Sequence, residues 1–172
     1  MITNSYNMEA TKKYCKIIKR RFIQVLENIE NLLTRIPENL YNKKISGYLI
    51  WKQIYHMLNS LERNFIDPNN YTYPEFHEEK LNSLDYKSKR ELDKKILEKY
   101  FKNIKKKVLN HLNYLDDNKI LDIINFKNIK ITKLDFILSQ YIHIMWHIGY
   151  LYSCINIETG KYPEYIGLYK NY

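Results

Sequence analysis

Residues 131–157 read ITKLDFILSQYIHIMWHIGYLYSCINI, a stretch with apolar side chains around almost the whole circumference of a helix. A helix of this kind is expected to be the inner element of a domain rather than a surface helix. Thr132 is followed three residues later by Asp135, which is the pattern of a capping box at a helix start. We therefore predict an inner helix over residues 131–157, against which the rest of the chain packs.

Two imidazoles lie within this apolar stretch. His143 and His147 are four residues apart, so in a helix they lie one above the other, with Cβ atoms about 5–6 Å apart. A buried ring nitrogen without a partner costs on the order of 1–3 kcal/mol. A metal ion shared by both rings would satisfy one nitrogen of each. The alternative is a pair of core histidines that form hydrogen bonds with tyrosines or carboxylates.

Three further amphipathic helices are predicted before this one. Apolar residues spaced by three and four positions mark helices over residues 9–36, 48–66 and 88–115. Ser88 with Glu91 gives the third of these helices a capping box. The connections between the helices are long, and no segment shows the alternation that is typical of a strand.

The pattern as a whole predicts an all-α fold. Four long amphipathic segments indicate a four-helix bundle with long connections, and no internal repeat or linker divides residues 1–172 into more than one domain. Residues 158–172 contain too much Gly, Pro and Tyr for a helix. We predict that they form a short extended C-terminal tail that covers the bundle.

Charge and hydropathy exclude several classes of function. The chain of 172 residues has a formal net charge of +9, but its lysines are spread through every segment. The densest basic run, residues 105–107, lies in a helical pattern whose apolar residues face the other way, so we interpret it as a solvated face and expect no nucleic-acid partner. No uninterrupted apolar run reaches the roughly 20 residues of a membrane span, so we expect no membrane partner.

The cysteines and the N-terminal residues indicate the cell compartment of the protein. Cys15 and Cys154 are too few for a disulfide framework and fit a reducing cytosol. Residues 1–15 contain no apolar segment of the kind that signal peptides have. We therefore expect a cytoplasmic protein.

A third histidine, His56, lies on the predicted helix 48–66. At about 100° per residue it points away from the centre of the apolar stripe of that helix. It can join His143 and His147 only if this flank of the helix faces a cleft or bundle mouth that the last helix also lines.

Three other potential ligands are predicted to lie outside such a site. His111 is near the end of the third predicted helix, where a cationic ring suits the helix dipole. His77 lies in a connection and is a weaker candidate for an extra ligand. Cys154 is seven residues after His147, which places it about 10 Å further along the helix axis.

The spacing His143-x-x-x-His147 differs from the zinc-protease motif, in which a Glu directly follows the first His, whereas here an isoleucine follows. The chain instead resembles the DinB-like (DinB/YfiT-like) superfamily of metal-binding four-helix bundles. Such proteins carry a His on the second helix, an acidic residue six positions later, and an H-x-x-x-H pair on the last helix. His56 with Glu62 and His143 with His147 match this pattern, and Gly149 matches the H-x-G ending.

The resemblance implies a divalent metal ion, zinc or nickel above all, held by His56, His143 and His147. Three neutral imidazoles suit these metals and leave positions open for water or substrate, whereas structural zinc is more often closed by four ligands. The resemblance also implies thiol-dependent transferases, isomerases and hydrolases, hence a low-molecular-weight thiol as a cofactor, and related bundles often pair as homodimers. Glu62 receives no catalytic role, because six residues of helix carry it away from His56; we interpret it as a surface or packing acid.

We therefore expect a metal-dependent enzyme that acts on a small-molecule substrate, of the thiol S-transferase or hydrolase type. The connection at residues 67–87, with Tyr71, Tyr73 and Phe76, would form part of a substrate lid. No residue stands out as a general base, so no catalytic residue is assigned beyond the metal ligands. The alternatives are a non-catalytic metal-binding or interaction bundle and a purely structural helical protein that dimerises through an exposed aromatic face.

Overall fold

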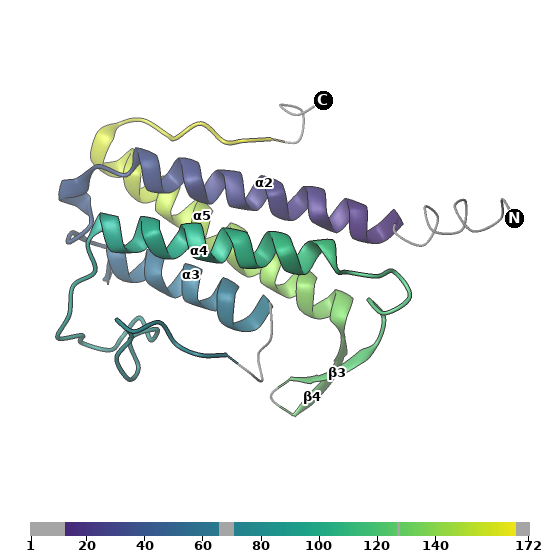
Figure 1. Ribbon diagram of the computed structural model, residues 1–172. Helices are drawn as coiled ribbons and strands as arrows, with labels where there is room; N and C mark the ends of the chain where they lie inside the picture. Colours follow the sequence, from purple (N-terminus) through teal and green to yellow (C-terminus); the bar gives the residue numbers. More distant parts are fainter. Residues whose placement is uncertain (1–12, 66–70, 127, 168–172) are drawn as a thin grey trace, which may run out of the picture.

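Four long helices make up more than half of the described residues (Figure 1). The computed structural model describes residues 13–65, 71–126 and 128–167. Within these ranges the helices are α2 (Lys13–Arg35), α3 (Ile50–Phe65), α4 (Lys94–Asn113) and α5 (Lys133–Thr159). Helices α2 and α3 each pack against both α4 and α5, and the hydrophobic core lies between them. The prediction of a mostly helical fold is confirmed.

Two small antiparallel hairpins were not expected from the sequence. The short elements of the connections are a 3-10 helix (Glu38–Leu40) and the strands β1 (Lys44–Ile45), β2 (Tyr48–Leu49), β3 (Ile123–Phe126) and β4 (Ile129–Thr132). β1 pairs with β2, and β3 pairs with β4. The expectation that the described chain has no strands is therefore wrong. Strands of two and four residues are too short to give an alternating pattern that sequence reasoning can detect.

The capping box at the start of α5 is present as predicted. The side chain of Thr132 accepts a hydrogen bond from the backbone N–H of Asp135, and the Asp135 carboxylate accepts one from the backbone N–H of Thr132. The helix ends two residues later than predicted, at Thr159. Gly160 follows it with a φ of 70°, a left-handed conformation that glycine adopts without strain.

The predicted start of α4 at Ser88 is wrong. The helix begins at Lys94, and its N-cap is Asp93, whose side chain accepts a hydrogen bond from the backbone N–H of Ile96 at 2.8 Å. The Ser88 hydroxyl instead forms hydrogen bonds outside any helix, with the Glu78 carboxylate and with the backbone of Arg90. The predicted helix starts and ends at residues 9–12 and 66 lie outside the described residues.

The inner helix is α3 rather than α5, so the prediction for residues 131–157 is wrong in this respect. Thirteen of the 16 residues of α3 are buried, among them the polar Gln53, Asn59 and Glu62. Only ten of the 27 residues of α5 are buried, and Ile142 and Trp146 are exposed. The polar residues of α3 hide its position from hydropathy, because their burial depends on hydrogen bonds to other segments.

The described part of the C-terminal tail is extended, as predicted, and runs along α2 (Figure 1). Side-chain amides of α2 hold it in place: Asn28 donates to the carbonyl of Ile166 at 2.9 Å, and Asn31 donates to that of Glu164 at 2.7 Å. Residues 168–172 lie outside the described chain. Among the helices that are described, none combines the length and the apolar character needed to cross a bilayer.

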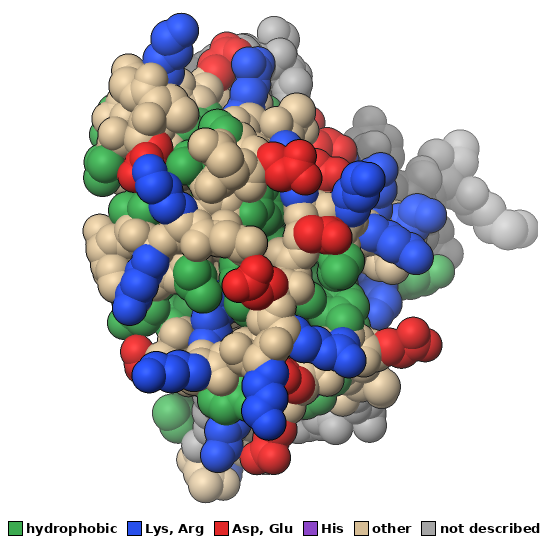
Figure 2. Space-filling model, turned by 90° about the vertical axis from the view of Figure 1, so that its left-hand side faces the viewer, with side chains coloured by type: hydrophobic (Ala, Val, Ile, Leu, Met, Phe, Trp, Pro, Cys, Tyr) green, Lys and Arg blue, Asp and Glu red, His purple; other side chains and the backbone are tan. Residues whose placement is uncertain are grey.

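Basic and acidic side chains are interspersed on the face shown in Figure 2. Two lysines of the predicted solvated run form ion pairs with acidic residues of other helices. Lys105 pairs with Glu30 at 2.7 Å, and Lys107 pairs with Glu62 at 2.5 Å. The run is therefore part of the contact between helices as well as part of the surface.

Candidate metal centre

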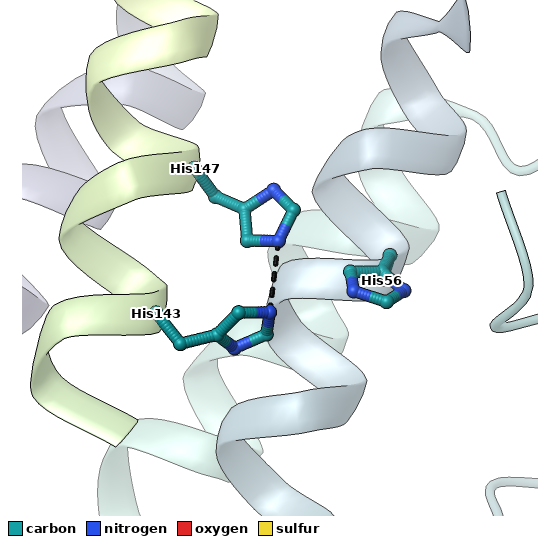
Figure 3. A group of neighbouring side chains, drawn as sticks. All are labelled: His56, His143 and His147. Carbon is teal, nitrogen blue, oxygen red and sulfur yellow. Dashed lines mark hydrogen bonds between the residues drawn. The ribbon is translucent and has the colours of Figure 1, made fainter. Parts of the chain in front are cut away.

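Three histidines from two helices converge on one point. His56 of α3 and His143 and His147 of α5 each offer one ring nitrogen, and these nitrogens lie within 4.8 Å of one another. Figure 3 shows the three rings in the space between α3 and α5, and we call them the three-histidine site. His147 is buried, and His56 and His143 are half-buried. The structure thus brings together the three residues that the sequence singled out.

His56 reaches the site from the flank of α3 that carries no apolar stripe. Its Nδ1 lies 2.6 Å from the backbone carbonyl of Asn82. A carbonyl only accepts hydrogen bonds, so Nδ1 carries the proton and donates it to Asn82. The second nitrogen, Nε2, is then an unprotonated donor atom for a metal, and in Figure 3 it is directed toward the other two rings.

His147 is held in a matching way from the other side. Its Nδ1 lies 3.1 Å from Oε1 of Gln53, a residue of α3 that is itself buried. Nδ1–H therefore donates to the amide oxygen, and Nε2 faces the site. Histidines that bind metals in proteins almost always donate the second ring N–H to a carbonyl or carboxylate in this manner, which fixes the tautomer and the ring orientation.

The two histidines of α5 complete the donor set. Nε2 of His147 lies 3.0 Å from Nε2 of His143. Two nitrogens that are each about 2.1 Å from one ion are about 3.0–3.4 Å apart for bond angles between a right angle and the tetrahedral angle. The separation of this pair therefore fits a shared divalent ion, and three imidazole nitrogens are a set that zinc, nickel, iron and copper accept.

Burial keeps the rings in the form that binds metals. Burial, followed by the proximity of His56 and His143, lowers the pKa of His147 to about 3. Burial and the proximity of His56 lower the pKa of His143 as well. Both rings are neutral near pH 7, so no proton has to leave them before a metal binds.

The other potential ligands lie outside the three-histidine site, as predicted. Nδ1 of His77 lies 2.5 Å from the hydroxyl of Tyr55, and its ring stacks on Tyr73 at 3.8 Å between centroids. The ring of His111 packs against Phe65 at 5.2 Å. The buried Cys154 is not part of the group of converging ligand atoms.

Glu62 is a packing acid rather than a surface acid. It is only 5% exposed, and its carboxylate accepts hydrogen bonds from the hydroxyls of Tyr100 at 2.7 Å and Tyr71 at 3.1 Å, in addition to the ion pair with Lys107. Burial raises the pKa of both tyrosines, so their hydroxyls stay protonated and donate to Glu62. Glu62 therefore joins α3 to α4 and to the connection that follows α3.

That connection contacts α3 at two neighbouring residues, Tyr55 and His56. In the aromatic cluster next to Glu62, Phe76 packs against Tyr55 at 6.0 Å between ring centroids. Further along, the carbonyl of Asn82 contacts His56. Within the part of the connection that the structure describes, Asn82 contacts the three-histidine site, and Phe76 and Tyr71 pack near Glu62. The substrate lid stays a prediction.

Sequence reasoning missed the two groups that orient the rings. Gln53 precedes His56 by three residues and is polar within a buried helix, which is a signal that could have marked it. The Asn82 contact leaves no trace in the sequence, because it is made by a backbone carbonyl that any residue would supply.

Comparison with known proteins gives no further assignment. No family model, no curated protein and no solved structure matches this chain.

Proposed function

We propose that this chain is a DinB-like four-helix bundle and a metal-dependent enzyme that acts on a small molecule. His56, His143 and His147 would hold a divalent ion, with zinc and nickel as the best candidates for three imidazole donors. The mutual packing of α2, α3, α4 and α5 and the position of the histidines on the second and last of these helices support the resemblance.

One observation carries the proposal: a ring nitrogen of His56 lies within 4.8 Å of ring nitrogens of His143 and His147, although His56 precedes His143 by 87 residues. Two of the three rings also have an acceptor on Nδ1, which leaves Nε2 available to the ion. Core histidines without a shared ligand would not need three nitrogens directed to one point.

The chemistry follows from the donor set and from its exposure. A divalent ion on three neutral imidazoles acts as a Lewis acid and lowers the pKa of a water or thiol that occupies an open position. Gln53 and the Asn82 carbonyl fix the rings, and buried His147 closes the inner side. His56 and His143 are half-buried, so a small molecule can approach from their side. We propose a thiol S-transferase or a hydrolase.

A non-catalytic metal-binding module is the second candidate. Apart from His143, which is itself a proposed ligand, the groups that form hydrogen bonds with His56 and His147 in the described chain are a backbone carbonyl and a side-chain amide, and neither can act as a general base. This candidate shares the three-histidine site and differs only in lacking a reaction.

We also propose that the protein is cytoplasmic and that its partner is a small-molecule substrate. Buried Cys15 and Cys154 do not form a disulfide with each other, which is compatible with a reducing compartment. Basic side chains are mixed with acidic ones on the face in Figure 2, which does not favour a nucleic-acid partner.

The deciding experiment is elemental analysis of protein purified without chelator, followed by titration with thiols. We expect close to one divalent ion per chain in the wild type and in His111→Ala, and loss of the ion in His147→Ala. Absence of metal from the wild type after zinc and nickel loading would contradict the site. A stoichiometric ion that leaves thiols and electrophiles unchanged would favour the binding module over the enzyme.

A further inference from the structure

An exposed tryptophan lies between the two histidines of α5. Trp146 directly precedes His147 and follows His143 by three residues, and its side chain is 63% exposed. Its ring lies 4.9 Å from the ring of His147 between centroids, at an interplanar angle of 82°. In the described chain Trp146 is not one of the buried or half-buried residues that make up the hydrophobic core and its margin. Core packing therefore does not account for a tryptophan at this position.

A second ring supports the ring of Trp146. Tyr150 follows it by four residues, so the two side chains share a face of α5. Their rings are stacked at 6.2 Å between centroids, with 16° between the planes. The hydroxyl of Tyr150 donates a hydrogen bond to the backbone carbonyl of Ile45 at 2.7 Å, which ties this ring to β1. We call Trp146 and Tyr150 the aromatic wall; the fold holds it at Tyr150, and solvent reaches it at Trp146.

The aromatic wall borders the exposed side of the three-histidine site. At about 100° per residue, the order of side chains around α5 runs from buried Ile144 through His147, His143 and Tyr150 to Trp146. Exposure rises in the same direction, because His147 is buried, His143 is half-buried and Trp146 is exposed. The histidine rings point from α5 toward α3 (Figure 3). A molecule that approaches these rings from solvent along α5 therefore passes the aromatic wall.

The chemistry of this side of the site is apolar. Residues 136–157 contain no Lys, Arg, Asp or Glu, whereas 27% of the whole chain is charged. The part of α5 around the histidines therefore offers a ligand no ion pair with a lysine, arginine or carboxylate. An exposed indole offers a flat apolar surface, and aromatic rings pack on one another in offset or edge-to-face arrangements. Small-molecule sites commonly combine such apolar surfaces with a few polar groups that fix orientation.

We propose that the small molecule that binds at the three-histidine site carries an aromatic group, and that this group packs against Trp146. The inference rests on the proposed function and narrows its substrate class to aromatic thiols and to aromatic compounds whose reacting atom is close to the ring. A ring joined to the metal-bound atom by one or two carbons is close enough, because Trp146 touches the ring of a ligand. Trp146 determines specificity in this arrangement, and Tyr150 acts through it by supporting the indole.

Calorimetric titration of the zinc-loaded protein with benzyl mercaptan and with ethanethiol tests the contact. Both thiols offer the same sulfur to the ion, and only the first carries a ring. We expect benzyl mercaptan to bind the wild type at least about 10-fold more tightly than ethanethiol. Trp146→Ala should lose this preference while its affinities for zinc and ethanethiol stay unchanged. Trp146→Phe keeps a ring and should retain most of the preference. Tyr114→Ala, which removes an exposed ring at the end of α4, should behave like the wild type.

Fluorescence gives a second readout of the same contact. The chain contains two tryptophans, the exposed Trp146 and the buried Trp51. Benzyl mercaptan should shift the emission of the zinc-loaded wild type to shorter wavelength, because the indole of Trp146 is then covered. Trp146→Phe keeps only Trp51 and should show no shift.

The outcomes separate this inference from the proposed function. A wild type that binds no zinc would overturn both. A zinc-loaded wild type that does not prefer the thiol with a ring, or a Trp146→Ala protein that keeps the preference, would overturn the aromatic contact alone. Equal affinity of benzyl mercaptan for the zinc-loaded and the chelator-treated wild type would also overturn it, since the ring would then bind apart from the metal.

Discussion

The Nε2 atoms of His143 and His147 lie 3.0 Å apart on the inner side of α5. Because Nδ1–H of His147 donates to Gln53, Nε2 of His147 is the acceptor of this contact in the metal-free protein, and His143 donates to it. For both Nε2 atoms to bind a divalent ion, the proton of His143 would have to be carried on its Nδ1, the tautomer in which the ring stays neutral. His56 supplies the third nitrogen from α3, so the site needs the contact between these two helices.

Loss of a ligand is expected to remove the metal and leave the fold. In His143→Ala, metal affinity should fall more than about 100-fold, while helicity and most of the thermal stability remain, because the hydrophobic core forms without the ion. Titration with zinc and circular dichroism of the metal-free and loaded proteins measure both quantities. An unfolded His143→Ala protein would show that the site is structural.

Gln53 is expected to control metal affinity without touching the ion. Gln53→Ala removes the acceptor of His147 Nδ1–H, so affinity should fall roughly 10- to 100-fold. Gln53→Glu keeps an acceptor and makes the ring more basic, so affinity should be retained or higher. The control is Gln24→Ala, which removes another buried amide that contacts the tail. Equal losses of affinity in Gln53→Ala and Gln24→Ala would show a general effect of stability.

The metal-free protein should lose stability in mild acid through His147. Its pKa is lowered to about 3 in the folded protein, whereas the unfolded chain binds this proton below its usual pKa of about 6.5. The unfolded state therefore holds more protons between these values, and the free energy of unfolding falls as the pH drops, by about 2 kcal/mol at pH 5 relative to pH 7.

Urea unfolding in the presence of chelator at pH 7 and pH 5 tests this dependence. His147→Gln cannot titrate, so the same change of pH should cost it about 2 kcal/mol less than it costs the wild type. Above about pH 7 the ring is neutral in both the folded and the unfolded state, so it no longer makes the free energy of unfolding depend on pH. If the free energy of unfolding fell equally with pH in the wild type and in His147→Gln, groups other than His147 would cause the acid sensitivity.

Glu62 and Lys107 form an ion pair, but we expect very different effects from removing each of them. Glu62→Ala leaves the hydroxyls of buried Tyr100 and half-buried Tyr71 without this acceptor and should destabilise the protein by about 2–4 kcal/mol. Lys107→Ala removes only the exposed side of the pair and should cost less than about 1 kcal/mol. Thermal or urea unfolding of the two variants gives the comparison, and similar losses would contradict the importance of the tyrosine contacts.

The start of α4 can be tested at its two candidate caps. Asp93→Ala removes the hydrogen bond to the backbone of Ile96 and should cost about 1 kcal/mol. Ser88→Ala changes hydrogen bonds within the connection and should cost less than half of that. A larger loss for Ser88→Ala than for Asp93→Ala would favour the helix start that the sequence predicted.

Local signals in the sequence predicted most of the helical elements correctly. The spacing of apolar residues located α2, α3, α4 and α5, and the Thr132–Asp135 capping box located the start of α5, because caps and stripes involve residues that are close in sequence. Local signals failed at Ser88, since Asp93 offers an equally good cap closer to the helix. They also failed for the hairpins, whose strands are too short to show a period.

Hydropathy also failed to predict which helix is the most buried, and the same cause explains the errors for α3 and α5. Hydropathy predicted α5 as the inner helix, but α5 has packed neighbours on one side and leaves Ile142 and Trp146 exposed. The more polar α3 is inner because Gln53 and Glu62 find hydrogen-bond partners on other segments. A sequence does not state which partners a polar residue will meet.

The sequence by itself determined the helices and the pair His143 and His147, because periodicity and spacing are properties of neighbouring residues, whereas His56 was added by the resemblance to a family. Only the tertiary structure decided that His56 faces the other two and that Gln53 and Asn82 orient the rings. It also left one face of α5 without a neighbour in the described chain. These features depend on how helices and connections distant in sequence pack, and packing is set by the sum of many contacts rather than by any local pattern.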